Sequence, residues 1–167
     1  TYTPLSSAGD QASCATERYR LGYSSSISLR LAFEAVLEDL IFDEFRTEAF
    51  EEAMRIAADL IGLGSQRPEH EIGSGPDNLW SMGNNVYWVI EAKTGAKSAA
   101  IGKRDVAQLG QSVAWFNERY DSTATGIPVI VHRSIQIYKD ATKLPNMRVV
   151  TEATLEDLRQ HLRDYSA

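Results

Sequence analysis

Two opposite charges follow directly on a strongly apolar segment of the chain. Glu91 and Lys93 come after the run Val-Tyr-Trp-Val-Ile at residues 86–90, whose residue types favour a buried strand. Residues two apart on a strand point to the same side, so both charges would leave the strand together. Burying either one unpaired would cost roughly several kcal/mol, which makes the pair a candidate for chemistry. The alternative is a surface ion pair, worth about 0–1 kcal/mol.

A third charged residue, Asp77, is expected to lie beside Glu91. Asp77 follows the turn signal Gly-Ser-Gly-Pro at residues 73–76, and Gly-Asn-Asn at residues 83–85 is typical of a β-hairpin turn. Two carboxylates held close together repel each other unless a cation lies between them, and Mg²⁺ suits such an all-oxygen site. A neighbouring lysine such as Lys93 can orient an attacking water or stabilise developing phosphate charge.

These motifs resemble the signature of the PD-(D/E)XK nuclease superfamily. The resemblance rests on Gly-Pro-Asp at residues 75–77 and Glu-Ala-Lys at residues 91–93, the latter at the end of an apolar strand. The order helix, hairpin, helix, strand over residues 48–133 is also similar to the superfamily core. The resemblance implies an α/β protein of restriction endonuclease-like fold, with a three-layer core in which helices flank a mixed central β-sheet.

The resemblance also implies a function, metal-dependent hydrolysis of DNA phosphodiester bonds. Asp77 and Glu91 would bind Mg²⁺, for which Mn²⁺ can substitute, with help from the carbonyl of Ala92. Lys93 would position the attacking water and stabilise the pentavalent phosphate. The expected products carry a 5′-phosphate and a 3′-hydroxyl.

Two further positions of the superfamily pattern lie on helices. Members commonly carry a glutamate on the helix before the hairpin, and Glu51, after Phe50, fits as an additional metal ligand, while Glu34 is a second candidate. The later helix often bears a glutamine in the site, which Gln108 matches. The tyrosine that some members place four residues further on is replaced here by Ser112. The alternative for Glu51 and Gln108 is a solvated position on a helix surface.

The charge is distributed unevenly along the chain. The net charge is −6, which by itself disfavours attraction to nucleic acid. Residues 92–150, however, hold nine Lys or Arg against four Asp or Glu. Lys97, Lys103 and Arg104 flank the candidate site there and are predicted to contact DNA phosphates; the alternative is a solvated loop.

Composition and targeting signals narrow the class of protein. A chain of 167 residues with 43% hydrophobic residues suits one globular domain. Its single cysteine excludes an internal disulfide framework, and no apolar run reaches the about 18 residues of a membrane span. No signal-peptide pattern is present at the start, so we expect a cytoplasmic protein without a membrane partner.

The wider context is expected to be a larger polypeptide, because the chain begins with Thr rather than Met. Segments at residues 65–69 and 112–116 are similar to nuclease domains attached to helicases. The resemblance therefore suggests a DNA-processing or defence protein in which a helicase or another domain delivers the substrate. The oligomeric state is left open, a homodimer included. The alternative function is a catalytically inactive nucleic-acid-binding or protein-interaction domain of the same fold.

Hydrophobic periodicity and turn residues predict the elements that would position the site. Residues 1–27 lack periodicity and are expected to form a flexible arm or linker, followed by one domain over residues 28–167. Helices are predicted at residues 28–46, 48–62, 105–120 and 155–165. Residues 65–72 are expected to be extended, and strands are predicted at residues 77–82, 86–90, 127–131 and 148–150.

Overall fold

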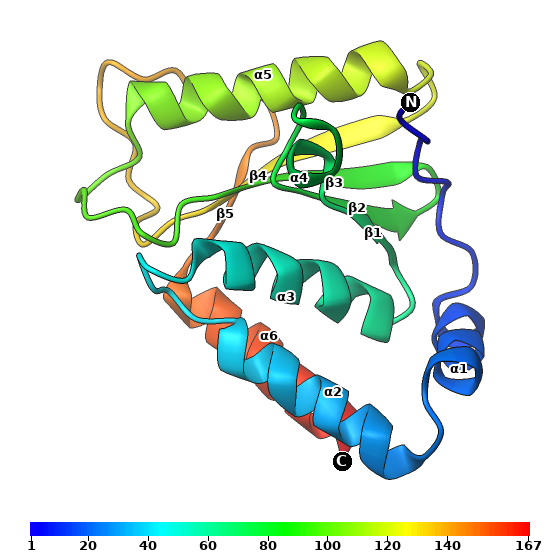
Figure 1. Cartoon of the computed structure of the whole chain (residues 1–167). Helices are drawn as coiled ribbons and strands as arrows, with labels where there is room; N and C mark the ends of the chain where they lie inside the picture. The colour runs from blue at the N-terminus through cyan, green and yellow to red at the C-terminus, as the bar shows by residue number, and fades with distance from the viewer.

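A five-stranded mixed β-sheet lies at the centre of the computed structural model, which describes residues 1–167 (Figure 1). The strands occur across the sheet in chain order: β1 (Gly64–Gln66), β2 (Asn78–Gly83), β3 (Val86–Ala92), β4 (Thr125–Val131) and β5 (Arg148–Val150). The first three strands pair antiparallel, and β3, β4 and β5 pair parallel. The predicted α/β class and mixed sheet are confirmed.

The turn between β2 and β3 fixes the position of the candidate site. Asn84 and Asn85 both have positive φ angles, 52° and 60°, as a two-residue turn with right-handed strand twist requires. The resulting register pairs Asn78 with Ile90. Asp77, one residue earlier, therefore comes level with Glu91 at the open end of the hairpin, as the sequence predicts.

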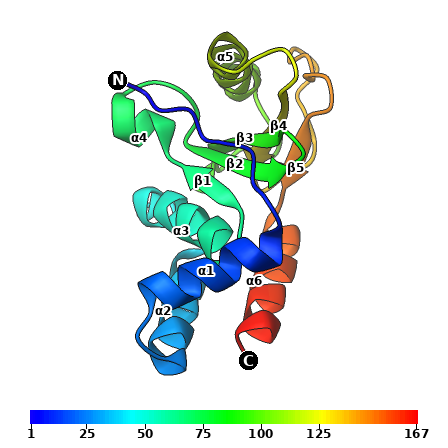
Figure 2. The same cartoon turned by 90° about the vertical axis from the view of Figure 1, so that its right-hand side faces the viewer.

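Helices cover both faces of the sheet, so the chain forms three layers (Figures 1 and 2). On one face, α5 packs on β3 and β4, and the short α4 lies beside β2. On the other face, α3 packs on β1 and β2, with α1, α2 and α6 around it. The helices are α1 (Gln11–Gly22), α2 (Ser26–Asp39), α3 (Thr47–Leu60), α4 (Pro68–Ile72), α5 (Lys103–Arg119) and α6 (Glu152–Ser166).

The two faces of β3 belong to different cores. Ile90 joins the largest apolar cluster, on the side of α3, whereas Val89 packs with Phe116 beneath α5. Because side chains alternate along a strand, Glu91 and Lys93 continue the row of Val89 and face α5. Helix α5 therefore covers the face of β3 from which Glu91 and Lys93 project.

The first 27 residues are not an irregular arm, and the prediction is wrong for Gln11–Gly22, which forms α1. Asp10 caps this helix by accepting a hydrogen bond from the amide of Ser13. Only Ala15 of α1 is buried, so the helix shows too little apolar periodicity to be recognised in the sequence. Residues before α1 also dock on the sheet, where the amide of Ala8 donates to Ser81 Oγ at 2.7 Å.

Two predicted elements differ in detail from the structure. The helix predicted over residues 28–46 ends at Asp39, and residues 40–46 form a loop before α3. The segment predicted to be extended at residues 65–72 contains α4, a single helical turn that starts at Pro68. Proline is well suited to a first helical position, because the amide that it lacks would have no partner there. No helix of the structure is long and apolar enough to span a membrane.

The docking of α1 can be tested at Gly62. This glycine has a φ of +84°, and a Cβ atom there would come within 2.0 Å of the backbone oxygen of Gln11. We expect Gly62→Ala to lower the free energy of unfolding by about 2–3 kcal/mol, measured by urea denaturation. Gly73→Ala is the matched control, because Gly73 has a similar φ of +73° but a Cβ there meets nothing within 4 Å. Equal stability of the two variants would contradict a docked α1.

Candidate active site

Glu91 is a carboxyl group in the interior of the protein. It lies in β3 facing α5, and only 1% of its surface is exposed. Its Oε1 accepts a hydrogen bond from Ser112 Oγ at 2.6 Å, while its Oε2 is buried without a partner. A buried polar atom of this kind is rare and costly in native proteins. No donor satisfies this second oxygen, and the Asp77 carboxyl lies within hydrogen-bonding reach of Glu91, so a proton shared with Asp77 or a ligand would satisfy it.

Asp77 provides the second carboxyl group, at the residue before β2. It is 8% exposed, and its Oδ2 accepts a hydrogen bond from the amide of Ala92 at 2.8 Å. Burial, and next the nearby Asp77 carboxylate, raise the pKa of Glu91 to about 8 against the opposing effects of Ser112 and Lys93. At neutral pH the pair therefore needs a proton or a cation.

Helix α5 contacts both charged residues at the end of β3. Lys93 Nζ donates a hydrogen bond to Gln108 Oε1 at 2.7 Å. Ser112, one helical turn after Gln108, donates its hydroxyl hydrogen bond to Glu91. Gln108 thus joins the predicted site. Ser112 was noted in the sequence only as a replacement for tyrosine; its spacing of four residues from Gln108 is the signal that could have assigned it.

Sequence reasoning missed Glu69, the second residue of α4. Its amide bonds to the carbonyl of Pro76 at 3.2 Å, which brings α4 next to Asp77. A hydrogen bond with the Asp77 carboxyl, and next burial, raise the pKa of Glu69. The available signal was its position eight residues before Asp77, just ahead of the glycine-rich turn. Glu69 lines a hollow of about 300 Å³ together with Gly75, Glu91, Gln108, Gln111, Ser112 and Trp115.

Gly75 allows this hollow to form beside Trp115. Its φ is +106°, and a Cβ atom would come within 2.8 Å of the Trp115 ring. Only glycine adopts this backbone conformation without strain. The glycine of the Gly-Pro-Asp motif therefore brings the turn before Asp77 close to α5.

Glu51 lies in α3, and its backbone carbonyl accepts a hydrogen bond at 2.8 Å from Nδ2 of Asn78, the residue after Asp77. Its Oε2 pairs with Arg67 Nη2 at 2.6 Å, and Arg67, 4% exposed, also bonds to Glu48 and Glu52. Burial raises the pKa of Glu51, although Arg67 opposes the shift. Glu51 forms no hydrogen bond with either carboxyl group of the hairpin. The other helix candidate, Glu34, is exposed on α2.

The predicted phosphate-contacting residues lie along the chain that leads from β3 into α5. Lys97 is exposed in the loop, and its Nζ pairs with Glu44 Oε2 at 2.7 Å. Lys103 and Arg104 are the first two residues of α5, and both are exposed. All three side chains are thus accessible to a polyanion.

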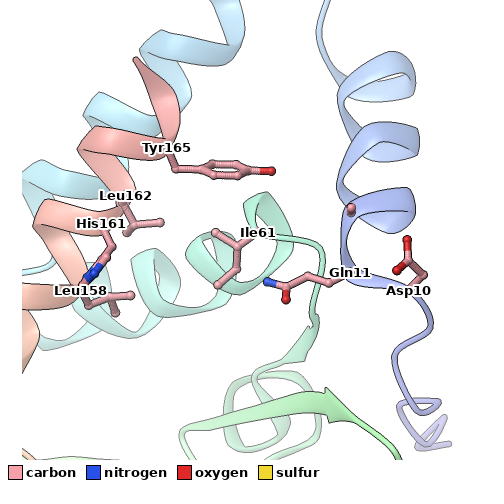
Figure 3. A pocket seen from close by; sticks show the side chains of 8 residues that line it. Asp10, Gln11, Ile61, Leu158, His161, Leu162 and Tyr165 are labelled. Atoms are coloured by element: carbon pink, nitrogen blue, oxygen red, sulfur yellow. The ribbon is translucent and has the colours of Figure 1, made fainter.

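A larger hollow of about 570 Å³ lies away from these residues, between α1, α3 and α6 (Figure 3). Ile61, Leu158 and Leu162 give it a largely apolar lining. Two of its polar groups form hydrogen bonds within their own helices: Asp10 caps α1, and His161 Nδ1 contacts the carbonyl of Asp157 at 2.7 Å. None of the residues that line this hollow carries a buried polar atom without a hydrogen-bond partner.

The stability of the metal-free protein should report the buried Glu91. Because the folded state binds its proton more tightly than the unfolded chain, this contribution is fully present below about pH 4.5 and is lost as pH rises through 8. We expect the wild type to lose about 2–4 kcal/mol relative to Glu91→Gln between pH 4.5 and 8, in urea unfolding with a chelator present. Glu34→Gln, at an exposed glutamate, should follow the wild type. Parallel curves for wild type and Glu91→Gln would contradict the buried carboxyl.

No protein-family model, curated protein or solved structure matches the chain. The residues at the open end of the β2–β3 hairpin therefore carry the functional argument. They comprise two carboxyl groups, a lysine held by a glutamine, and the buried Oε2 of Glu91, which no donor satisfies.

Proposed function

We propose that the chain is a metal-dependent nuclease of the PD-(D/E)XK type that hydrolyses DNA phosphodiester bonds. The observation that carries the proposal is the buried, unpartnered Oε2 of Glu91 beside Asp77, with Lys93 on the same face of β3. Two carboxyl groups in this position repel each other, and a lysine close by suits an anionic substrate. The order α3, β1–β3, α5, β4 is the order of helices and strands on which the superfamily resemblance rests.

The donor atoms of the site suit Mg²⁺ or Mn²⁺. Asp77 and Glu91 would hold the cation, and the carbonyl of Ala92, whose amide already faces Asp77, would add an oxygen. Glu69, next to Asp77, is a further candidate ligand. Glu51 could bind the cation only if its ion pair with Arg67 were broken. When bound, the cation would supply a water of lowered pKa and neutralise phosphate charge.

The remaining residues of the site orient the charges. Gln108 accepts a hydrogen bond from Lys93 and so directs its ammonium group, which would stabilise the charge that develops on the phosphoryl oxygens. Ser112 holds Glu91 Oε1 and leaves Oε2 for the cation. Trp115 and Gly75 close one side of the hollow and limit the access of bulk water.

Cleavage of DNA tests the proposal directly. We expect the protein to nick supercoiled plasmid with Mg²⁺ or Mn²⁺ and to stop when EDTA is added. Asp77→Asn and Lys93→Ala should each lower the rate by at least about 100-fold, because the first removes a carboxylate ligand of the cation and the second removes the positive charge at the reacting phosphate. Asp164→Asn, at an exposed residue of α6, is the matched control. Undiminished cleavage by both site variants would refute the assignment.

Calorimetry with Mn²⁺ separates this proposal from a catalytically inactive nucleic-acid-binding or protein-interaction domain. An active site should bind Mn²⁺, and Asp77→Asn should weaken the binding at least about 10-fold through the loss of one carboxylate ligand. Binding of DNA without any binding of Mn²⁺ would favour the inactive domain. In either case we propose a larger, cytoplasmic protein, with a helicase or other domain delivering the DNA.

A further inference from the structure

Phe45 is the most exposed large apolar side chain of the molecule, with 88% of its surface open to solvent. It lies in the loop of residues 40–46, between α2 and α3. The loop is anchored on both sides of the ring: the amide of Phe45 donates to Asp43 Oδ1 at 2.8 Å, and Arg46 pairs with Asp39. The ring is therefore held out into solvent by an ordered backbone.

This loop packs against the segment that follows Lys93. A Cβ atom on Gly95, two residues after Lys93, would come within 3.1 Å of the Cα atom of Glu44. The carboxylate of Glu44 pairs with Lys97 at 2.7 Å. Figure 1 shows the loop of residues 40–46 in cyan and the green loop after β3 at the same end of the molecule. The loop that carries Phe45 thus packs against the segment that follows Lys93.

A basic residue and a second exposed aromatic residue bond to the same loop after β3. Arg133 Nη1 bonds to the carbonyl of Lys97 at 3.3 Å and has no carboxylate partner. Tyr138, 46% exposed, is tied to the loop after β3, because its amide bonds to the carbonyl of Ile101 at 3.0 Å. Aromatic rings for base stacking combined with basic groups for the backbone are the features by which proteins bind single-stranded nucleic acid.

We propose that Phe45, Lys97, Arg133 and Tyr138 form a docking surface for unpaired DNA beside the scissile phosphate. The inference rests on the proposed nuclease function and adds the class of substrate. Phe45 can stack only on a base that is free of its duplex neighbours, so DNA with a single-stranded segment, such as a fork or an overhang, binds better than a continuous duplex. The surface also gives a protein of net charge −6 a non-ionic contribution to DNA binding.

Binding of labelled oligonucleotides tests the surface independently of cleavage. Fluorescence anisotropy in EDTA and low salt would compare a single-stranded DNA 20-mer, its duplex and an RNA of the same sequence. We expect Phe45→Ala to weaken single-strand binding by about 5- to 100-fold, since stacking is worth about 1–3 kcal/mol per base. Phe45→Trp should stay within about 3-fold of the wild type, and duplex binding should not change. Leu31→Ala, at a 63% exposed apolar residue of α2, is the matched control.

Each outcome has one interpretation. Equal single-strand binding by wild type and Phe45→Ala, a preference for duplex or RNA, or no binding to any of the three would overturn the docking surface. If the protein cleaves plasmid but Phe45→Ala binds single-stranded DNA as well as the wild type does, the docking surface is refuted and the proposed nuclease function stands. Single-strand binding that depends on Phe45, without cleavage under any metal condition, would keep the surface and remove the proposed hydrolysis.

Discussion

The burial of Glu91 is the constraint around which the structure is organised. An isolated carboxylate in a protein interior is too costly to persist, so such a group must be hydrogen-bonded, protonated or neutralised by a cation. Ser112 satisfies one oxygen, whereas Asp77 makes the charged state less favourable. Buried oxygens without a hydrogen-bond partner therefore remain here, on Glu91 (Oε2), on Asn78 next to Asp77, and on Thr94 next to Lys93. A site that is complete only with a ligand is the arrangement expected for function rather than for stability.

Helix α5 supplies both the stability and the chemistry that this arrangement needs. Its apolar face packs Leu109 and Phe116 onto β3 and β4, and the burial of these side chains offsets the cost of the charged pair. Between these packing residues, Gln108 and Ser112 meet Lys93 and Glu91. A single helix therefore orients the side chains of Lys93 and Glu91, so any motion of α5 would affect both.

The central hairpin was predictable because its signals are local. The two asparagines of its turn and the apolar run at residues 86–90 determine the register, and the register brings Asp77 level with Glu91. Gln108 was predictable by resemblance alone. The helix α1 was not, because it buries only Ala15 and its packing against α3 is a tertiary effect. The position of Glu69 depends on α4, whose five residues are too few to show hydrophobic periodicity. The ion pair of Glu51 depends on Arg67, which follows β1 and is distant in sequence, so hydrophobic periodicity does not predict it either.

The length of the turn at Asn84 and Asn85 is constrained, whereas the loops at the other end of the sheet are not constrained in the same way. One residue more or less there would change the register and move Glu91 and Lys93 to the face of α3, because side chains alternate along a strand. The loops at the opposite end, at residues 40–46 and 94–100, do not set the register of this hairpin, so their sequence can vary without moving Glu91 or Lys93. Evolution could therefore alter what this end of the molecule binds while the paired charges stay where they are.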